Sequence, residues 1–228
     1  MKTAVITGGS RGIGRAIAFE LLHRGITRLA ITARTAEKLS EAKEALAAAG
    51  AEVLAFQADV RDRETMAAVV GQTINAFGRI DAWVNNAGVA RRKLFLETSP
   101  AEWEEIIDVN LKGVLVCTAA VLPHMVANGK GVIVNIASGA GKVGFPELSV
   151  YCASKFGVVG FTESLAREVG GSGVKVYAVC PGSTDTRMYR SLYPEREPAA
   201  KPEEVARVVG RLVAGRLAAP PGRCVEVY

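Results

Sequence analysis

The chain has 228 residues, 49% of them hydrophobic, so it is long enough to bury the core of one large domain or two small ones. Its formal net charge is +5, and its 28 lysines and arginines are spread along the sequence, which argues against a nucleic-acid-binding protein. The four cysteines form no CxxC pair and have only two histidines as possible partners, so we expect buried thiols in a reducing compartment and no metal site.

The sequence also indicates where the protein resides. No apolar run approaches the roughly 20 residues that a membrane span needs. The first residues already have the pattern of a strand, so no signal or transit peptide is expected before the fold. We therefore predict a cytoplasmic protein that does not bind a membrane.

Short β-branched runs alternate along the chain with longer segments of helical period. The expected strands are residues 4–7, 29–33, 53–57, 82–85, 132–136, 174–179 and 224–227. The expected helices are residues 13–24, 36–49, 63–77, 101–125, 150–170 and 202–214. This alternation is typical of the α/β class, so we predict one domain over residues 1–228: a Rossmann fold with a doubly wound, seven-stranded parallel sheet and helices on both faces.

A glycine-rich turn follows the first expected strand and precedes an apolar helical pattern. Glycines allow the backbone to approach a pyrophosphate closely, and a helix N-terminus offers free N–H groups and a partial positive charge. We predict a dinucleotide-binding loop; a turn without a ligand is the alternative. Its candidate residues are Gly8, Ser10, Arg11, Gly12, Ile13 and Gly14.

The end of the second expected strand indicates which dinucleotide is bound. NAD-binding chains usually carry an acidic residue there, but no Asp or Glu occurs between Leu21 and Ala36. Arg34 stands at this position, and Arg11 projects from the glycine loop. Guanidinium groups suit the 2′-phosphate of NADP, so we predict a preference for NADP(H), with NAD(H) possible. Two solvated surface arginines are the alternative.

Two further turns follow the third and fourth expected strands. Asp59 and Val60 come after the third, where a carboxylate can accept a hydrogen bond from the adenine amino group. Asn86, Ala87 and Gly88 come after the fourth, where small and amide side chains suit the adenosine ribose. Either turn alone is also compatible with a purely structural role.

Tyr151 and Lys155 open an expected helix on one face, four residues apart, and Ser138 follows the strand before it. The phenol, the ammonium and the hydroxyl are therefore expected to meet at the sheet's carboxyl edge. An ammonium about 5 Å from a phenol lowers the phenol pKa by about two units, which favours a base near neutral pH. We predict proton transfer by Tyr151.

These motifs, together with the GxxxGxG spacing, Asn110 and Pro181-Gly182, resemble the short-chain dehydrogenase/reductase family over nearly the whole chain. Within that family the chain is similar to 3-oxoacyl-[acyl-carrier-protein] reductases and carbonyl reductases. The resemblance implies an oxidoreductase that transfers hydride between the nicotinamide and a carbonyl or secondary alcohol. It also implies that Lys155 binds the nicotinamide ribose, Ser138 holds the substrate oxygen, and Asn110 anchors a water connected to the lysine.

The resemblance extends to the region after the sixth expected strand. Pro181, Gly182, Thr184 and Thr186 look like the family's nicotinamide-binding turn, although the threonines could be ordinary turn residues. Residues 183–201 correspond to the segment that covers the substrate, so we expect a mobile lid.

The expected substrate is a ketone or alcohol with an apolar part, including a carrier-bound 3-oxoacyl group. Arg91, Arg92 and Lys93 either meet an acidic carrier or form a solvated basic turn. The expected assembly is a homodimer or homotetramer. A non-catalytic dinucleotide-sensing protein is the alternative. In such a protein we would expect Ser138, Tyr151 or Lys155 to be replaced, but all three are present.

Overall fold

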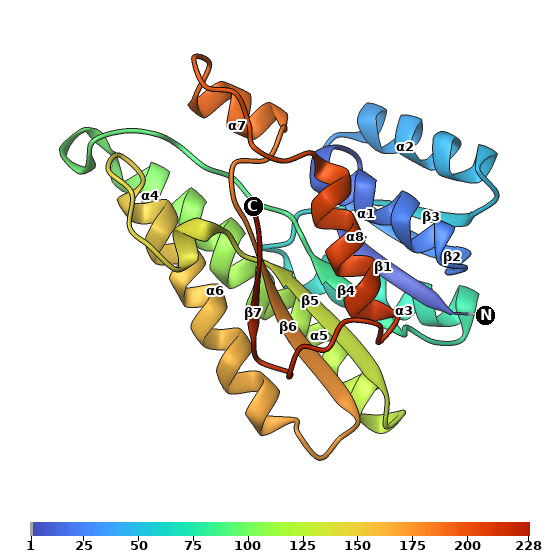
Figure 1. Ribbon diagram of the computed structural model, residues 1–228. Helices are drawn as coiled ribbons and strands as arrows, with labels where there is room; N and C mark the ends of the chain where they lie inside the picture. The colour runs from blue at the N-terminus through green and yellow to red at the C-terminus, as the bar shows by residue number, and fades with distance from the viewer. Residues whose placement is uncertain (1) are drawn as a thin grey trace.

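Seven parallel strands form one sheet in the order β3-β2-β1-β4-β5-β6-β7 in a computed structural model that describes residues 2–228 (Figure 1). The strands are β1 (Thr3–Thr7), β2 (Arg28–Ala33), β3 (Glu52–Gln57), β4 (Ala82–Asn85), β5 (Gly131–Ile136), β6 (Val174–Pro181) and β7 (Cys224–Val227). The predicted single-domain Rossmann fold of the α/β class is confirmed, and each expected strand is present.

Two layers of helices cover the sheet (Figure 1). The first layer consists of α1 (Gly12–His23), α2 (Ala36–Ala48) and α8 (Pro202–Val213), and the second of α3 (Arg63–Phe77), α5 (Gly113–Ala127) and α6 (Ser149–Glu168). Each layer packs against one face of the sheet and forms a separate hydrophobic core with it. Alternate residues of β1 point into the two cores: Ala4 and Ile6 pack beneath the first layer, and Val5 packs beneath the second. Because both faces are buried, the strands are continuous apolar runs.

The strand order reverses between β1 and β4. The chain winds outward from β1 through β2 to β3, and it then returns to add β4 on the other side of β1. In a doubly wound sheet the loops diverge at this point, which leaves a crevice at the carboxyl ends of the strands. The motifs after β1 and β4 border this crevice.

The helix expected over residues 101–125 is interrupted. It consists of α4 (Pro100–Ile107), a π-helical turn η2 (Asp108–Lys112) and α5. A capping box of Ser99 and Glu102 fixes the start of α4, because each residue's side chain accepts a hydrogen bond from the other's backbone N–H. π-helical turns inside helices often occur at functional sites, and Asn110 lies at the centre of this one.

The combined helical run Pro100–Ala127 is long and apolar enough to cross a membrane, which the sequence reading did not anticipate. Half of its most apolar stretch is buried inside the protein. Val116, Cys117 and Val121 of this run pack in the second core. An apolar core helix of an α/β protein passes the same test of length and composition.

Three short helices lie in segments that were expected to be loops: η1 (Phe95–Glu97), η3 (Gly139–Gly141) and α7 (Arg187–Leu192). None is long enough to show a helical period in the sequence. They lie in the connections that follow β4, β5 and β6, on the carboxyl side of the sheet.

The expectation of four free thiols was wrong for one pair. Cys180 in β6 and Cys224 in β7 are joined by a disulfide, with their Cα atoms 6.3 Å apart, whereas Cys117 and Cys152 are free and buried. The two strands are neighbours in the sheet, which brings together cysteines that are 44 residues apart in sequence.

Candidate cofactor and active site

The glycine loop is packed tightly against the turn after β4. A Cβ atom at Gly14 would lie 2.3 Å from the Gly8 carbonyl oxygen and 2.4 Å from Asn86 Nδ2, so no side chain fits at residue 14. Asn86 Nδ2 in turn donates to the carbonyl oxygens of Thr7 at 2.9 Å and Gly8 at 3.1 Å. The predicted loop residues are therefore held together by Asn86, which the sequence reading assigned to the ribose.

The N-terminus of α1 has the properties of an anion site. Arg11 occupies the cap position, but its side chain makes no capping hydrogen bond, and the first turn contains no acidic residue. The first N–H groups of the helix therefore lack a side-chain acceptor, and they carry the positive end of the helix dipole. A pyrophosphate fits this chemistry.

Arg11 and Arg34 are both exposed, and within residues 2–228 neither forms an ion pair. Arg34 directly follows β2, and its backbone carbonyl accepts a hydrogen bond from Gln57 at 3.1 Å. The charge of Arg34 contributes to lowering the pKa of Asp59, so the guanidinium group lies near enough to the carboxylate to interact with it electrostatically. Both guanidinium groups are available for a phosphate.

Asp59 is engaged more closely than the sequence suggested. Its carboxylate accepts hydrogen bonds from Arg61 Nε at 3.0 Å and Nη2 at 2.7 Å, and this hydrogen bonding is the main reason that its pKa lies below the ordinary value. An adenine amino group would share this carboxylate with Arg61. The sequence reading missed Arg61, although its position two residues after Asp59 was a usable signal.

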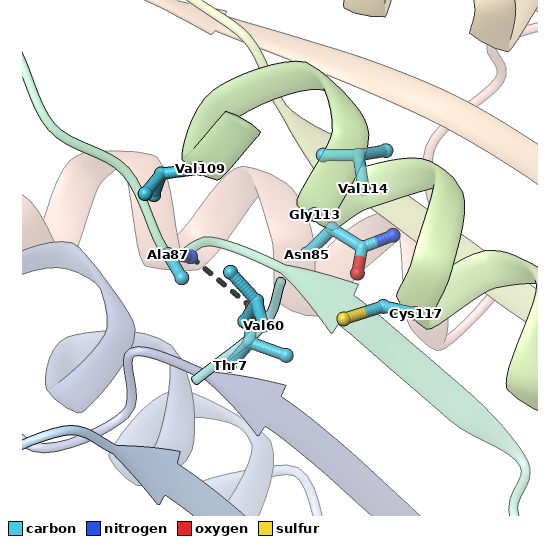
Figure 2. Close-up of a pocket in the computed structure, with 8 residues that line it drawn as sticks. All are labelled: Thr7, Val60, Asn85, Ala87, Val109, Gly113, Val114 and Cys117. Carbon is cyan, nitrogen blue, oxygen red and sulfur yellow. Dashed lines mark hydrogen bonds between the residues drawn. The ribbon is translucent and has the colours of Figure 1, made fainter. Parts of the chain in front are cut away.

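A recess behind these motifs is shown in Figure 2. It has no room for a water molecule. Thr7 Oγ1 accepts a hydrogen bond from Ala87 N at 3.1 Å across it (Figure 2). Val60 is packed so closely against the start of α5 that a Cβ atom at Gly113 would lie 2.7 Å from Val60 Cγ2. The Val60 side chain is therefore part of the wall behind the cofactor crevice. The recess is lined by Thr7, Val60, Asn85, Ala87, Val109, Gly113, Val114 and Cys117.

Asn110 connects the π-helical turn to two neighbouring segments. Its Oδ1 accepts from Val89 N and its Nδ2 donates to Val89 O, both at 2.8 Å, and Nδ2 also donates to Ser154 Oγ at 3.1 Å. The side chain is fully buried. A Cβ atom at Gly88 would lie 3.3 Å from Asn110 Oδ1 and 3.8 Å from Lys155 Nζ, which places the amide beside the lysine. Asn110 thus fixes the loop after β4 against α6.

Ser138, Tyr151 and Lys155 converge at the ends of β5 and α6. The Ser138 hydroxyl lies close enough to the Tyr151 phenol to lower the pKa of that phenol, and it accepts a hydrogen bond from Ala140 N at 3.1 Å. Lys155 Nζ lies 5.7 Å from the centre of the Tyr151 ring and donates to the Ile136 carbonyl oxygen at 2.9 Å. The structure therefore brings together the three side chains that the sequence predicted to meet.

The pKa of Tyr151 is shifted in the direction opposite to the one expected from the sequence. Burial raises the pKa of Tyr151, and the nearby Ser138 hydroxyl opposes this only in part. Burial also lowers the pKa of Lys155 to about 8. Lys155 is not among the groups that shift the Tyr151 pKa, so the lowering expected from its charge is absent, and loss of solvent sets the direction of the shift. Because its pKa is raised, the Tyr151 phenol keeps its proton at neutral pH.

The segment after β6 runs from the Ser138, Tyr151 and Lys155 group to the glycine loop. Thr184 Oγ1 donates to Gly182 O at 3.2 Å, and Thr186 Oγ1 caps α7 by accepting from Tyr189 N at 3.1 Å. Thr186 Cγ2 would lie 3.5 Å from a Cβ atom at Gly12. Both hydroxyls thus have structural partners, which was the alternative considered for them, and both lie beside the crevice.

The basic turn at residues 91–93 is paired within the chain. Arg91 forms an ion pair with Glu105 at 2.5 Å, and Lys93 forms one with Glu102 at 2.8 Å. Arg92 Nε donates to Glu147 at 2.7 Å. Each of the three cations is thus paired with a carboxylate of α4 or of the loop before α6, and they do not form a free basic patch.

Among residues 2–228, no group of three histidine, cysteine, aspartate or glutamate side chains has the geometry to hold a metal ion. The site described above consists of backbone N–H groups, guanidinium groups, hydroxyls, amides and one lysine. These groups suit a phosphorylated organic cofactor.

Comparisons with known proteins agree with this site. The family described as short chain dehydrogenase matches residues 2–197. The chain is 40% identical over 181 residues to the 3-oxoacyl-[acyl-carrier-protein] reductase FabG of Staphylococcus aureus strain Mu50, covering 79% of this chain and 74% of the relative. It is 38% identical over 215 residues to the 3-oxoacyl-[acyl-carrier-protein] reductase of Synechocystis, covering 91% and 87%.

A crystal structure of levodione reductase superposes with a TM-score of 0.92 at 33% sequence identity, covering 99% of this chain and 95% of the other. The likeness thus includes the sheet, both helix layers and the segment after β6. Sequence and structure together show that this chain is an oxidoreductase of the short-chain dehydrogenase family.

Proposed function

We propose that this protein is an NADPH-preferring carbonyl reductase in which Tyr151 is the general acid. The convergence of Ser138, Tyr151 and Lys155 at the carboxyl edge of β5 carries the proposal. A hydroxyl and a phenol that lie side by side can both contact one carbonyl oxygen. The relatives named as 3-oxoacyl-[acyl-carrier-protein] and levodione reductases support a ketone as substrate.

The proposed cofactor is held by five groups of residues. The free N–H groups of α1 and the glycine loop bind the pyrophosphate, and Arg11 and Arg34 bind the 2′-phosphate. Asp59 accepts from the adenine, while Asn86, Ala87 and Gly88 border the adenosine ribose. The segment from Pro181 to Thr186 holds the nicotinamide. When bound, NADPH supplies a hydride to the carbonyl carbon and leaves as NADP⁺.

The residues of this chain perform the remaining steps. Ser138 donates a hydrogen bond to the substrate oxygen and positions it beside Tyr151. Tyr151 donates its proton to that oxygen as negative charge develops there. Lys155, protonated below its pKa of about 8, stabilises the phenolate that remains and binds the nicotinamide ribose. Asn110 is a positioning residue that keeps the loop after β4 and helix α6 in register around Lys155.

Tyr151→Phe is the direct test of this proposal. The variant keeps the ring and its packing but removes the proton, so we expect NADPH-dependent reduction of ketones to fall by at least about 100-fold. NADPH binding, followed by cofactor fluorescence, should stay within about twofold of the parent. Near-full turnover in the variant would reject Tyr151 as the acid. A parent protein that binds NADPH but reduces no ketone would instead favour a dinucleotide sensor.

We also propose a location, an assembly and a substrate class for this protein. We place the protein in the cytoplasm as a homodimer or homotetramer that acts on a small ketone, an alcohol or a carrier-bound 3-oxoacyl group. NAD(H) is a weaker second cofactor. Residues 183–201 are proposed to close over the bound substrate.

A further inference from the structure

A small core lies between the lid segment and the catalytic tyrosine. Ala140, Leu148 and Cys152 are its buried members, and Tyr151 and Tyr193 pack against it. Tyr193 follows α7 directly, and its ring centre lies 5.4 Å from that of Tyr189. The lid therefore places an aromatic side chain over the same cluster that holds Tyr151.

Two guanidinium groups hold the Tyr193 ring. Arg92 Cζ lies 4.8 Å from the ring centre, and Arg196 Cζ lies 5.0 Å from it. Both distances are within the range of cation–π attraction. Arg196 belongs to the lid itself, because its N–H donates to the Tyr193 carbonyl at 3.1 Å. Arg92 comes from the loop after β4, so it is the group that connects Tyr193 to the body of the protein.

Arg92 is fixed at the same time to the opposite wall of the crevice. Its Nε donates to Glu147 at 2.7 Å, and its Nη1 donates to the Leu192 carbonyl at 3.4 Å. Glu147 has a backbone φ of +64°, unusual for a residue with a side chain, and its carbonyl accepts from Lys93 N at 2.9 Å. The guanidinium thus joins three segments: the loop after β4, the loop before α6, and the end of α7.

The base of the lid is already closed. Thr184 and Ala200 form an isolated parallel bridge, and Ala199 and Ala200 both donate to the Ser183 carbonyl, at 2.9 and 3.0 Å. Only the tip of the segment is therefore free to move relative to the sheet. The contacts of Arg92 with Leu192 and Tyr193 act on this tip.

We infer that Arg92, Glu147 and Tyr193 form a clamp that holds the lid against the catalytic tyrosine and selects compact ketones over long 3-oxoacyl chains. The inference rests on the proposed function, because it assumes that Tyr151 faces the substrate. Tyr193 is the specificity-determining residue in this inference, because its ring and the Tyr151 ring pack against the same small core and a long acyl chain that extends past Tyr151 would meet it. Arg92 is a positioning residue that acts through Tyr193.

Lid closure can be measured without turnover, by hydrogen exchange of residues 186–197 in the ligand-free protein. Arg92→Gln removes the ion pair and the cation–π contact, so exchange of this segment should be about fivefold faster than in the parent. Arg91→Gln is the matched control: it removes the neighbouring charge, whose partners lie in α4, and exchange should not change. Arg92→Lys keeps the charge and should recover part of the protection.

Selectivity is measured with cyclohexanone and an N-acetylcysteamine thioester of 3-oxodecanoic acid. Tyr193→Ala should raise the ratio of kcat/KM for the thioester to that for cyclohexanone by about tenfold or more, whereas Tyr193→Phe keeps the parent ratio. Equal exchange in Arg92→Gln and Arg91→Gln, or an unchanged ratio in Tyr193→Ala, would overturn the clamp. If the parent reduces neither ketone, the proposed function fails, and the exchange result still decides whether Arg92 holds the lid.

Discussion

The backbone carbonyl of Lys155 lies directly against Gly141, in the short helix that follows Ser138. A Cβ atom at residue 141 would come within 2.7 Å of the Lys155 carbonyl oxygen. This contact seats the Ser138 turn on α6, and it accounts for how a serine and a tyrosine from different elements come to lie beside each other.

Gly141→Ala should separate Ser138 from Tyr151. The added methyl group must push η3 away from α6, which we expect to cost about 1–3 kcal/mol of stability and to lower kcat more than it raises KM. Chemical denaturation and steady-state kinetics measure the two effects. Gly144→Ala is the control, because a Cβ atom there meets nothing within 4 Å. Equal behaviour of the two variants would show that the contact at Gly141 is unimportant.

Lys155→Met should be more stable than the parent at pH 7. Burial lowers the Lys155 pKa from 10.5 to about 8, so the folded protein bears the cost of a buried cation below pH 8, up to about 3 kcal/mol. Between pH 8 and 10.5 the unfolded chain binds the proton and the folded chain does not, so the stability of the parent rises with pH. The advantage of the variant, measured by urea denaturation, should therefore shrink towards pH 10. An advantage that is independent of pH would contradict the assignment.

Ketone reduction and alcohol oxidation should have opposite pH dependences. Because burial raises the pKa of Tyr151, the phenol stays protonated at neutral pH and can serve as the acid. Reduction should be constant from about pH 6 and fall above pH 8 as Lys155 loses its charge. Oxidation needs the phenolate and should still be rising at pH 9. Initial rates in both directions test this, and a plateau of oxidation near pH 7 would mean that cofactor binding lowers the Tyr151 pKa.

Arg34→Asp should weaken or reverse the cofactor preference. The substitution removes a donor for the 2′-phosphate and adds an acceptor for a free ribose hydroxyl, so KM for NADPH should rise by about 10- to 100-fold while KM for NADH falls. Lys43→Asp makes the same charge change on exposed α2 and should leave both KM values as they are. Equal parental kinetics with the two cofactors would reject the role of Arg34.

Much of the architecture follows from local patterns in the sequence. A run such as residues 132–136 is apolar at every position but Asn135, because both faces of β5 are covered, and this pattern identifies a central parallel strand. The glycine loop, Tyr151 and Lys155 were recognisable because residues that are close in sequence define each feature. The glycines form one tight turn, and Tyr151 and Lys155 are four residues apart, so they lie one helical turn apart on the same face of a helix. Their positions after expected strands then placed them at one edge of the sheet.

The tertiary structure alone decided the contacts between distant segments. No periodicity could show that Cys180 adjoins Cys224 or that Arg92 joins Glu147 and Tyr193, because such pairs depend on side-chain packing after the chain has folded. The protonation of Tyr151 was also decided there, since desolvation depends on what surrounds the phenol. Sequence determines which groups reach the crevice; packing determines their partners and their charge.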